Sequence, residues 1–362
     1  ACTITLPASA SAGDTIIFAD YARYWGTNGI VIDSNGLNYQ GDSDAYTVAY
    51  ETDGQSLQIV YADSTKGWIP INDDAVTDVP TTTQGIFGYG DGPHNITNLV
   101  SVVGVVSTDV TGVGTARYGL AACEYGGDKG IFGFGATTGI TNLVSNAGVV
   151  GTDVSGVGSG RYGLVACSYG DDKGIFGYGR TPGTNWNATN LVSSVGVVGT
   201  DVTGVGTARM ELAGTEYGGD KGIFAYGAPH GGSKVSLSNL VANTGVVATD
   251  TTGVGTARDG LAACKYGTQT AIFAYGSTGS NSSLSNLVSN TGVVATDVTG
   301  VGTARYSISA CEYGGDKGIF AYGNTGSVVS LSNLVSNSGV VASDVTGVGT
   351  ARYDLAACSY GG

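Results

Sequence analysis

RYGLAACEYGGDKGIFGFG, residues 117–135, is the stretch that decides the fold, because close variants of it recur through the C-terminal part of the chain. Each complete copy opens on an Arg, continues to an Ile-Phe pair and is followed by an Asn-Leu-Val triplet. Internal repeats with periods of about 20–50 residues indicate solenoids, propellers or arrays. The repeated Arg is found at Arg117, Arg161, Arg209, Arg258, Arg305 and Arg352.

Each unit of about 47 residues contains four short runs that favour β-strands. In the copy that opens at Arg117, these are residues 117–125, 131–135, 142–146 and 148–154, with glycines and hairpin turns between them. Four strands in a unit of this length are typical of a propeller blade. A solenoid is the alternative, but the repeats of parallel β-helices are much shorter.

The two ends of the array predict that it closes. The first copy lacks the Arg-led run, because Gln84 leads directly into residues 85–87, and the chain ends in an additional Arg-led run at 352–360. A C-terminal strand that completes the first blade leaves no unpaired edge. We therefore predict an all-β protein in which a small N-terminal β-domain precedes a closed six-bladed β-propeller of four-stranded blades at 85–362.

Composition and charge exclude two classes of function. Glycine supplies 63 of the 362 residues, about 17% against an average of about 7%, and charged residues supply only 12%. The net charge is −14, so no basic surface is available to neutralise nucleic-acid phosphates. No apolar run approaches the roughly 20 residues that span a bilayer. We expect neither nucleic-acid binding nor membrane insertion.

The repeat resembles the kelch-type propeller repeat. Its order is R-x-x-L-A-A, a turn, I-F-x-Y-G and a strand that begins N-L-V, across residues 85–362. The second Gly pair of the kelch pattern is Tyr-Gly or Phe-Gly in this chain, and the Trp usual in the fourth strand is missing. The segment is therefore kelch-like, and the resemblance implies a closed propeller.

Residues 1–72 contain no copy of the repeat and read as short strands between Gly, Asn and Asp turns. Residues 70–84 are acidic and rich in Pro and Thr, which predicts a linker at 73–84. A spaced pattern in the first segment is similar to a β-domain of tailed-phage appendage proteins, which lies between a virion-attachment part and a distal module. The pattern comprises Leu6-Pro7, Gly13-Asp14, Asn28, Ile30, Asn35-Gly36, Gly41, Leu57, Tyr61 and Lys66-Gly67-Trp68.

This second resemblance implies a location and partners. It implies a tail-fibre or capsid-fibre protein, made in the host cytoplasm and carried on the outside of the virion. The partners that it implies are a host-surface glycan or receptor and other virion proteins. Fibre proteins are commonly trimeric, so it also implies a homotrimer.

The residues that usually carry catalysis are scarce. There are two His residues, no CxxC motif and no GK[ST] phosphate loop, so we expect no catalytic residues, no cofactor and no metal. One cysteine position of the repeat holds Cys in five copies, which we interpret as small buried core residues of a protein that folds in a reducing cytosol. That position is Cys123, Cys167, Cys264, Cys311 and Cys358, with Thr215 in the remaining copy.

An Asp lies eight residues before each repeated Arg. One interpretation is a ring of charges around the propeller axis. The interpretation that we favour is structural, with an Asp that caps a turn and a partly buried Arg that ties one blade to the next. The six positions are Asp109, Asp153, Asp201, Asp250, Asp297 and Asp344.

All variation in length falls in one loop. The distance from the Asn-Leu-Val triplet to the next Arg is 19 residues in all six copies, whereas the loop between the second and third runs varies from six to eleven. Loops on a rigid scaffold usually carry binding, and an indole beside amides suits recognition of a sugar. The candidate binding residues are His94, Asn95, Arg180, Asn185, Trp186, Asn187, His230, Lys234, Asn281 and Asn324.

These observations predict a non-enzymatic virion appendage protein whose propeller binds a host-surface glycan or receptor through its variable loops. The alternative is a structural virion or surface module used for protein–protein docking. A glycan-degrading depolymerase is a third reading, and it needs two carboxylates about 5–10 Å apart in a cleft.

Overall fold

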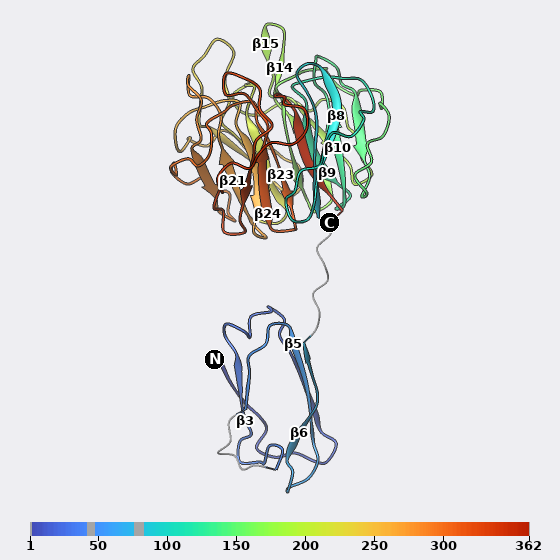
Figure 1. Ribbon diagram of the computed structural model, residues 1–362, viewed down its shortest axis with the longest axis vertical. Helices are drawn as coiled ribbons and strands as arrows, with labels where there is room; N and C mark the ends of the chain where they lie inside the picture. The colour runs from blue at the N-terminus through green and yellow to red at the C-terminus, as the bar shows by residue number, and fades with distance from the viewer. Residues whose placement is uncertain (1, 42–47, 76–82, 362) are drawn as a thin grey trace. The chain divides into compact units, whose positions relative to one another are not determined.

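The computed structural model describes residues 2–41, 48–75 and 83–361, which form two compact units, Ala1–Pro80 and Thr81–Gly362 (Figure 1). Within those ranges every regular element is a β-strand, which confirms the all-β prediction. The described residues include no helix long and apolar enough to cross a membrane.

In the described part of the N-terminal unit, six strands form two three-stranded sheets, and all six begin within the segment 1–72 that the sequence predicts to be β. In the first sheet β1 pairs in parallel with β3, and β3 pairs with β4 in the antiparallel sense. The second sheet is antiparallel, in the order β2-β5-β6. The strands are β1 (Cys2–Thr5), β2 (Thr15–Ala19), β3 (Ile30–Asp33), β4 (Val48–Tyr50), β5 (Gln55–Tyr61) and β6 (Trp68–Ala75).

The core of this unit is built from strands whose side chains alternate between the interior and the surface. Along β5 the residues alternate between buried and half-buried, so that Leu57 and Ile59 point inward. Trp68 stacks edge-on against Tyr61, and the hydroxyls of Tyr39 and Tyr50 are hydrogen-bonded at 2.8 Å. Apolar rings and paired hydroxyls thus fill the space between the two sheets.

The C-terminal unit consists of six three-stranded antiparallel sheets and one short hairpin. Each sheet uses one Arg-led run, one Ile-Phe run and one Asn-Leu-Val run as its three strands. Sheet 1 is β26 (Ala356–Tyr360), β7 (Gln84–Gly90) and β8 (His94–Val100); sheet 2 is β9 (Ala121–Tyr125), β10 (Lys129–Gly133) and β11 (Thr141–Val144); sheet 3 is β12 (Val165–Tyr169), β13 (Lys173–Gly177) and β16 (Thr189–Val192). Sheet 4 is β17 (Ala213–Tyr217), β18 (Lys221–Ala225) and β19 (Ser238–Val241); sheet 5 is β20 (Ala262–Tyr266), β21 (Thr270–Ala274) and β22 (Ser285–Val288); sheet 6 is β23 (Ser309–Tyr313), β24 (Lys317–Ala321) and β25 (Ser332–Val335).

The fourth predicted run of each unit forms isolated β-bridges in place of a full strand. In sheet 1, Val106 pairs with Val100 and Val110 pairs with Thr97. Between these bridges the side-chain amide of Asn98 donates to the carbonyl of Ser107 at 3.0 Å, where a regular ladder would use a backbone N–H. The repeated Asn therefore holds the fourth segment through its side chain, which interrupts the strand.

The sheets follow one another around a closed cycle. The first strand of each sheet packs against the first strand of the next, and β26 packs against β9. The C-terminal strand β26 also completes sheet 1, with Ala356 opposite Gly88 and Tyr360 opposite Gln84. Two segments at opposite ends of the repeat region thus share one sheet.

Two boundaries differ from those read from the sequence. The predicted linker at 73–84 overlaps both of its neighbours, because β6 continues to Ala75 and β7 begins at Gln84. Within the predicted closing strand 352–360, only Ala356–Tyr360 is a strand, since Arg352 leaves the ladder for the contacts described below. Residues 76–82 of the linker lie outside the described residues.

Candidate functional site

The repeated Arg joins three segments of its own sheet to the preceding sheet. Nε of Arg258 donates to the carbonyl of Tyr275 at 2.8 Å, and Nη2 donates to Oδ1 of Asn286 at 2.7 Å. Its guanidinium carbon lies 4.4 Å from the ring centre of Tyr226, which belongs to sheet 4. The equivalent arginines are all at most 1% exposed, so none contributes to a ring of exposed cations.

The repeated Asp caps the loop that enters its sheet. Oδ2 of Asp250 accepts a hydrogen bond of 2.6 Å from the hydroxyl of Thr207, and Oδ1 accepts one of 2.9 Å from Nδ2 of Asn239. Burial raises the pKa of Asp250, but these hydrogen bonds outweigh it and hold the pKa below its ordinary value. In sheet 1 the equivalent bond joins Thr350 to Asp109, across 241 residues of sequence.

The repeated Cys side chains pack against glycines of the next sheet. A Cβ atom on Gly174 would lie 2.4 Å from Sγ of Cys123, and four further Cys–Gly pairs leave as little room. Burial raises the pKa of the Cys123 thiol. The remaining copy carries Thr215 where the others have Cys, and Ala271 where the others have Gly. The two substitutions occur at facing positions of the repeat, which indicates that they compensate each other in packing.

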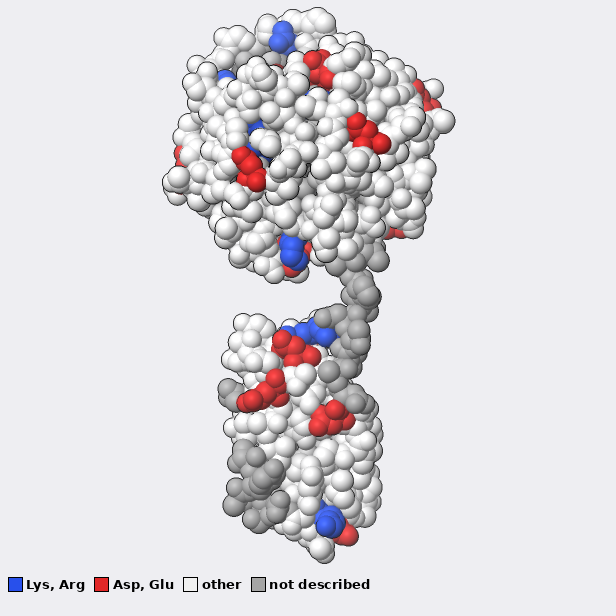
Figure 2. All heavy atoms as spheres, viewed as in Figure 1, with Lys and Arg blue, Asp and Glu red and all other residues white. Residues whose placement is uncertain are grey.

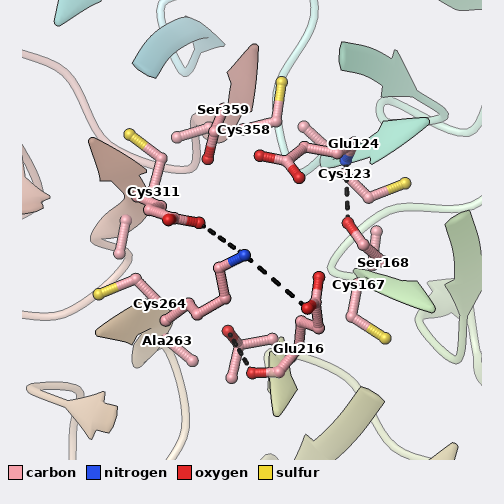
Figure 3. A pocket seen from close by; sticks show the side chains of 18 residues that line it. Cys123, Glu124, Cys167, Ser168, Glu216, Ala263, Cys264, Cys311, Cys358 and Ser359 are labelled. Atoms are coloured by element: carbon pink, nitrogen blue, oxygen red, sulfur yellow. Dashed lines mark hydrogen bonds and ion pairs between the residues drawn. The ribbon is translucent and has the colours of Figure 1, made fainter. Parts of the chain in front are cut away.

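The centre of the cycle is lined by one polar residue from each sheet, which we call the central polar ring (Figure 3). Three carboxylates come from alternate sheets, and Lys265 reaches between two of them, with Nζ 2.9 Å from Glu312 and 3.7 Å from Glu216. A ring of small residues lies beside it and leaves a cavity of about 70 Å³. The central polar ring is Glu124, Ser168, Glu216, Lys265, Glu312 and Ser359.

Carboxyl groups outnumber the single ammonium in this ring, since three Glu side chains accompany Lys265. Burial raises the pKa of Glu216 to about 7 against the attraction of Lys265, and it does the same for Glu312. Burial lowers the pKa of Lys265, but the charges of Glu312 and Glu216 outweigh it and the pKa lies above its ordinary value. The ammonium of Lys265 is thus an internal cation that occupies the centre of the ring.

Six backbone hydrogen bonds of 2.7–3.2 Å close a second ring, two residues before the first strand of each sheet begins. In each bond the N–H of the second residue after the repeated Arg donates to the carbonyl of its counterpart in the preceding sheet, and the sixth bond returns to the first. We call this ring the central collar, and it borders a cavity of about 80 Å³. Its members are Gly119, Gly163, Glu211, Gly260, Ser307 and Asp354.

The collar holds its residues in left-handed backbone conformation. Three copies place Gly there, but Glu211, Ser307 and Asp354 have φ of 54°, 48° and 51°. A residue with a Cβ atom in this region usually costs about 1 kcal/mol relative to glycine. Glu211 comes from sheet 4 and Asp354 from sheet 1, so these two carboxyl groups enter the cavity from opposite sides.

The residue just before each collar position is aromatic in four copies. A Cβ on Gly119 would lie 3.1 Å from Cβ of Tyr162, and Gly163 and Gly260 are placed in the same way against Met210 and Tyr306, so in these copies the residue lies against the collar glycine of the preceding sheet. The same residues pair through their backbone with the start of the variable loop, as Tyr162 does with Arg180. The six are Tyr118, Tyr162, Met210, Asp259, Tyr306 and Tyr353.

The variable loops form the rim around this end of the cycle. In sheet 3 the loop contains its own hairpin, β14 (Arg180–Thr181) and β15 (Thr184–Asn185), which projects from the unit in Figure 1. Nε1 of Trp186 donates to the hydroxyl of Thr181 at 3.1 Å, and the indole remains half-buried. The hairpin therefore orients the indole while leaving part of its face accessible.

Several of the predicted binding residues have their polar groups in use between loops. Nδ2 of Asn185 donates to the carbonyl of Ala228 at 2.9 Å, and Lys234 is paired with Asp259 at 2.7 Å. The other amides bond to backbone groups, Asn95 to Gly114, Asn187 to Gly206, Asn281 to Asn324, and Asn324 itself accepts from the N–H of Gly326. His94 is half-buried in β8 and His230 is exposed.

These ten residues are distributed over five of the six loops. The collar residues meet in one ring of backbone hydrogen bonds, and the sequence analysis did not single them out. A signal was present, since the two positions after the repeated Arg differ among copies, as does the position of the central polar ring. The sequence alone could not indicate that these positions meet at the centre.

No family model matches the chain, and no curated protein matches it. Within residues 2–41, 48–75 and 83–361, no group of three or more His, Cys, Asp or Glu side chains is arranged to hold a metal ion.

Proposed function

We propose that the C-terminal unit is a closed six-bladed β-propeller, each blade made of three strands and a bridged fourth segment. We further propose that it is a non-enzymatic module that binds a host-surface glycan or receptor. The closed ring of six backbone hydrogen bonds supports the propeller, because six equal neighbours satisfy one another only around a common axis.

One observation carries the binding proposal. The six variable loops and the central collar lie at the same end of the cycle, joined by backbone pairs such as Tyr306 with Asn324 and Asp259 with Ser277. That end therefore combines a rigid repeated base with residues that differ from copy to copy. Such a division between scaffold and loops is the usual arrangement of a binding face.

The residues of this face favour carbohydrate. On the side of the C-terminal unit that Figure 2 shows, charged side chains are sparse, in keeping with a chain that is only 12% charged. The loops offer the half-buried indole of Trp186, tyrosines beside the collar and many Ser, Thr and Asn side chains. Aromatic faces stack on sugar rings, and hydroxyls and amides bond their oxygens.

The virion location is proposed from the N-terminal pattern. Residues 1–72 are similar to a β-domain of tailed-phage appendages, and the unit to which they belong has its own apolar core. From the same resemblance we propose that other virion proteins are partners and that the protein assembles as a homotrimer. A docking module without a glycan ligand is the alternative.

Calorimetric titration of the whole chain with purified lipopolysaccharide and capsular polysaccharides tests the binding proposal. We expect heat with at least one polysaccharide, and at least tenfold weaker binding by Trp186→Ala. Lys173→Ala, at a turn between β12 and β13, is the matched control and should bind like the unchanged protein. The absence of heat with every polysaccharide would favour the docking alternative.

Glycan cleavage is a second candidate because of one observation. Glu211 and Asp354 border the same cavity, and burial raises the pKa of both, to about 7 for Glu211. A carboxyl group with a raised pKa is what a glycosidase uses as its acid. Release of reducing ends from a bound polysaccharide, lost in Glu211→Gln, would support cleavage over binding alone.

A further inference from the structure

The cavity at the central collar restricts the charge and size of a ligand group more than the rim of variable loops does. It lies at the centre of the face on which the proposed glycan binding depends, and its charged groups do not repeat. Three collar positions depart from glycine although the backbone there is left-handed, and two of them introduce carboxyl groups on opposite sides of the cavity.

The charges around the cavity are predominantly negative. Burial raises the pKa of Glu211 to about 7, and the charges of Asp259 and Asp354 raise it further, against Lys234 and Arg180. Lys234 is already paired with Asp259. Burial likewise raises the pKa of Asp354. A hydrogen bond from the Ser307 side chain offsets part of this rise, and the charge of Asp91 adds to it. A ligand cation placed between Glu211 and Asp354 would stabilise the charged forms of both carboxyl groups.

The surroundings favour an organic cation over a metal ion. Among the residues that the structure describes, two carboxyl groups border the cavity, whereas a metal ion of the calcium type takes six to eight oxygen ligands. Apart from these two carboxyl groups, the cavity is lined by glycines, Ser307 and the aliphatic side chains of Leu and Ile, which supply few oxygen ligands for a metal ion. The cavity of about 80 Å³ has room for a small polar group and not for a whole sugar ring.

We propose that the central collar binds the protonated amine of an amino sugar, with Glu211 and Asp354 as its carboxylate partners. This inference rests on the proposed glycan-binding function and specifies its ligand as a glycan that carries free amino groups. The indole of Trp186 then belongs to the outer part of the same binding face.

Paired oligosaccharides test the inference in the whole chain. Calorimetry at pH 6.5 compares a glucosamine hexamer, which carries free amines, with an N-acetylglucosamine hexamer, in which the same amines are acetylated and neutral. We expect at least tenfold tighter binding of the glucosamine hexamer. The double variant Glu211→Gly and Asp354→Gly should lose at least tenfold in affinity for it and keep its fold, because three other copies already hold glycine at the collar.

Glu124→Gln is the matched control, since Glu124 belongs to the central polar ring and not to the collar cavity. It should bind the glucosamine hexamer as the unchanged protein does. Equal affinity for the two hexamers, or full affinity in the double glycine variant, would overturn the amine assignment. If a neutral polysaccharide binds and Trp186→Ala abolishes that binding, the proposed function stands and this inference alone fails. If no saccharide of any kind binds, both fail.

Discussion

The Arg network and the central collar lie only two residues apart in the repeat, yet they behave differently among the six copies. The Arg is identical in all six, and each of its neighbours in the network is fixed by a hydrogen bond or a ring contact. The collar position holds Gly, Glu, Ser and Asp, and only its backbone is bonded in the same way throughout. In this chain the side chains of the Arg network, which join neighbouring sheets, are the same in every copy, whereas the side chains that border the collar cavity differ between copies.

The largest expected loss of stability comes from removing one arginine of the Arg network. Arg258→Ala removes three hydrogen bonds and leaves the oxygens of Tyr275 and Asn286 buried without a donor. Loss of a buried charged partner typically costs about 3–5 kcal/mol. We expect the midpoint of urea unfolding, followed by circular dichroism, to fall accordingly. A loss below about 1 kcal/mol would contradict the structural role of the Arg.

The Cys–Gly contact should give a smaller effect with a specific rescue. Gly174→Ala places a methyl group against Sγ of Cys123, and overpacking of this kind costs about 1–3 kcal/mol. Adding Cys123→Thr reproduces the natural combination of Thr215 with Ala271 and should restore at least half of the lost stability. A double-mutant cycle on unfolding free energies measures this coupling. Additive losses would show that the two positions do not compensate each other.

Glu211→Gln should stabilise the fold at alkaline pH only. Because the pKa of Glu211 is about 7 in the folded protein and ordinarily 4.5, the folded state binds the proton more tightly. Stability therefore rises as pH falls from about 7 to about 4.5, and the ionised carboxylate destabilises the fold at pH 8. We expect Gln to add about 1–2 kcal/mol at pH 8, after allowance for partial exposure, and little at pH 4. Thermal melts at the two pH values check the sign, and a destabilised variant at pH 8 would contradict it.

The smallest effect is expected at a repeated position that faces solvent. Lys173 pairs with its neighbour Asp172 at the turn between β12 and β13, and both side chains are over 40% exposed. An exposed ion pair usually contributes between about 0 and 1 kcal/mol. Lys173→Ala should therefore leave the unfolding midpoint nearly unchanged. A large loss of stability would mean that repeated residues stabilise the fold whether or not they are buried.

The sequence predicted most of the strands of the C-terminal unit, because constant spacing between Arg, Ile-Phe and Asn-Leu-Val leaves few alternatives for where the strands begin and end. It did not predict that the fourth run would be interrupted. That outcome depends on the amide of Asn98, which takes the place of a backbone donor. It identified the variable loops as candidates, but it could not indicate that amides such as Asn185 would be used between neighbouring loops.

By itself the sequence determined the all-β class, the six-fold repeat and the identity of its invariant side chains, since these follow from local periodicity and turn residues. Only the tertiary structure decided which residues meet at the centre. The collar joins Gly119 to Asp354 across 235 positions of sequence, and it brings Glu211 to the side opposite Asp354. Such contacts depend on the angle at which each sheet packs against the next around a closed cycle. The sequence of a single repeat does not specify that angle.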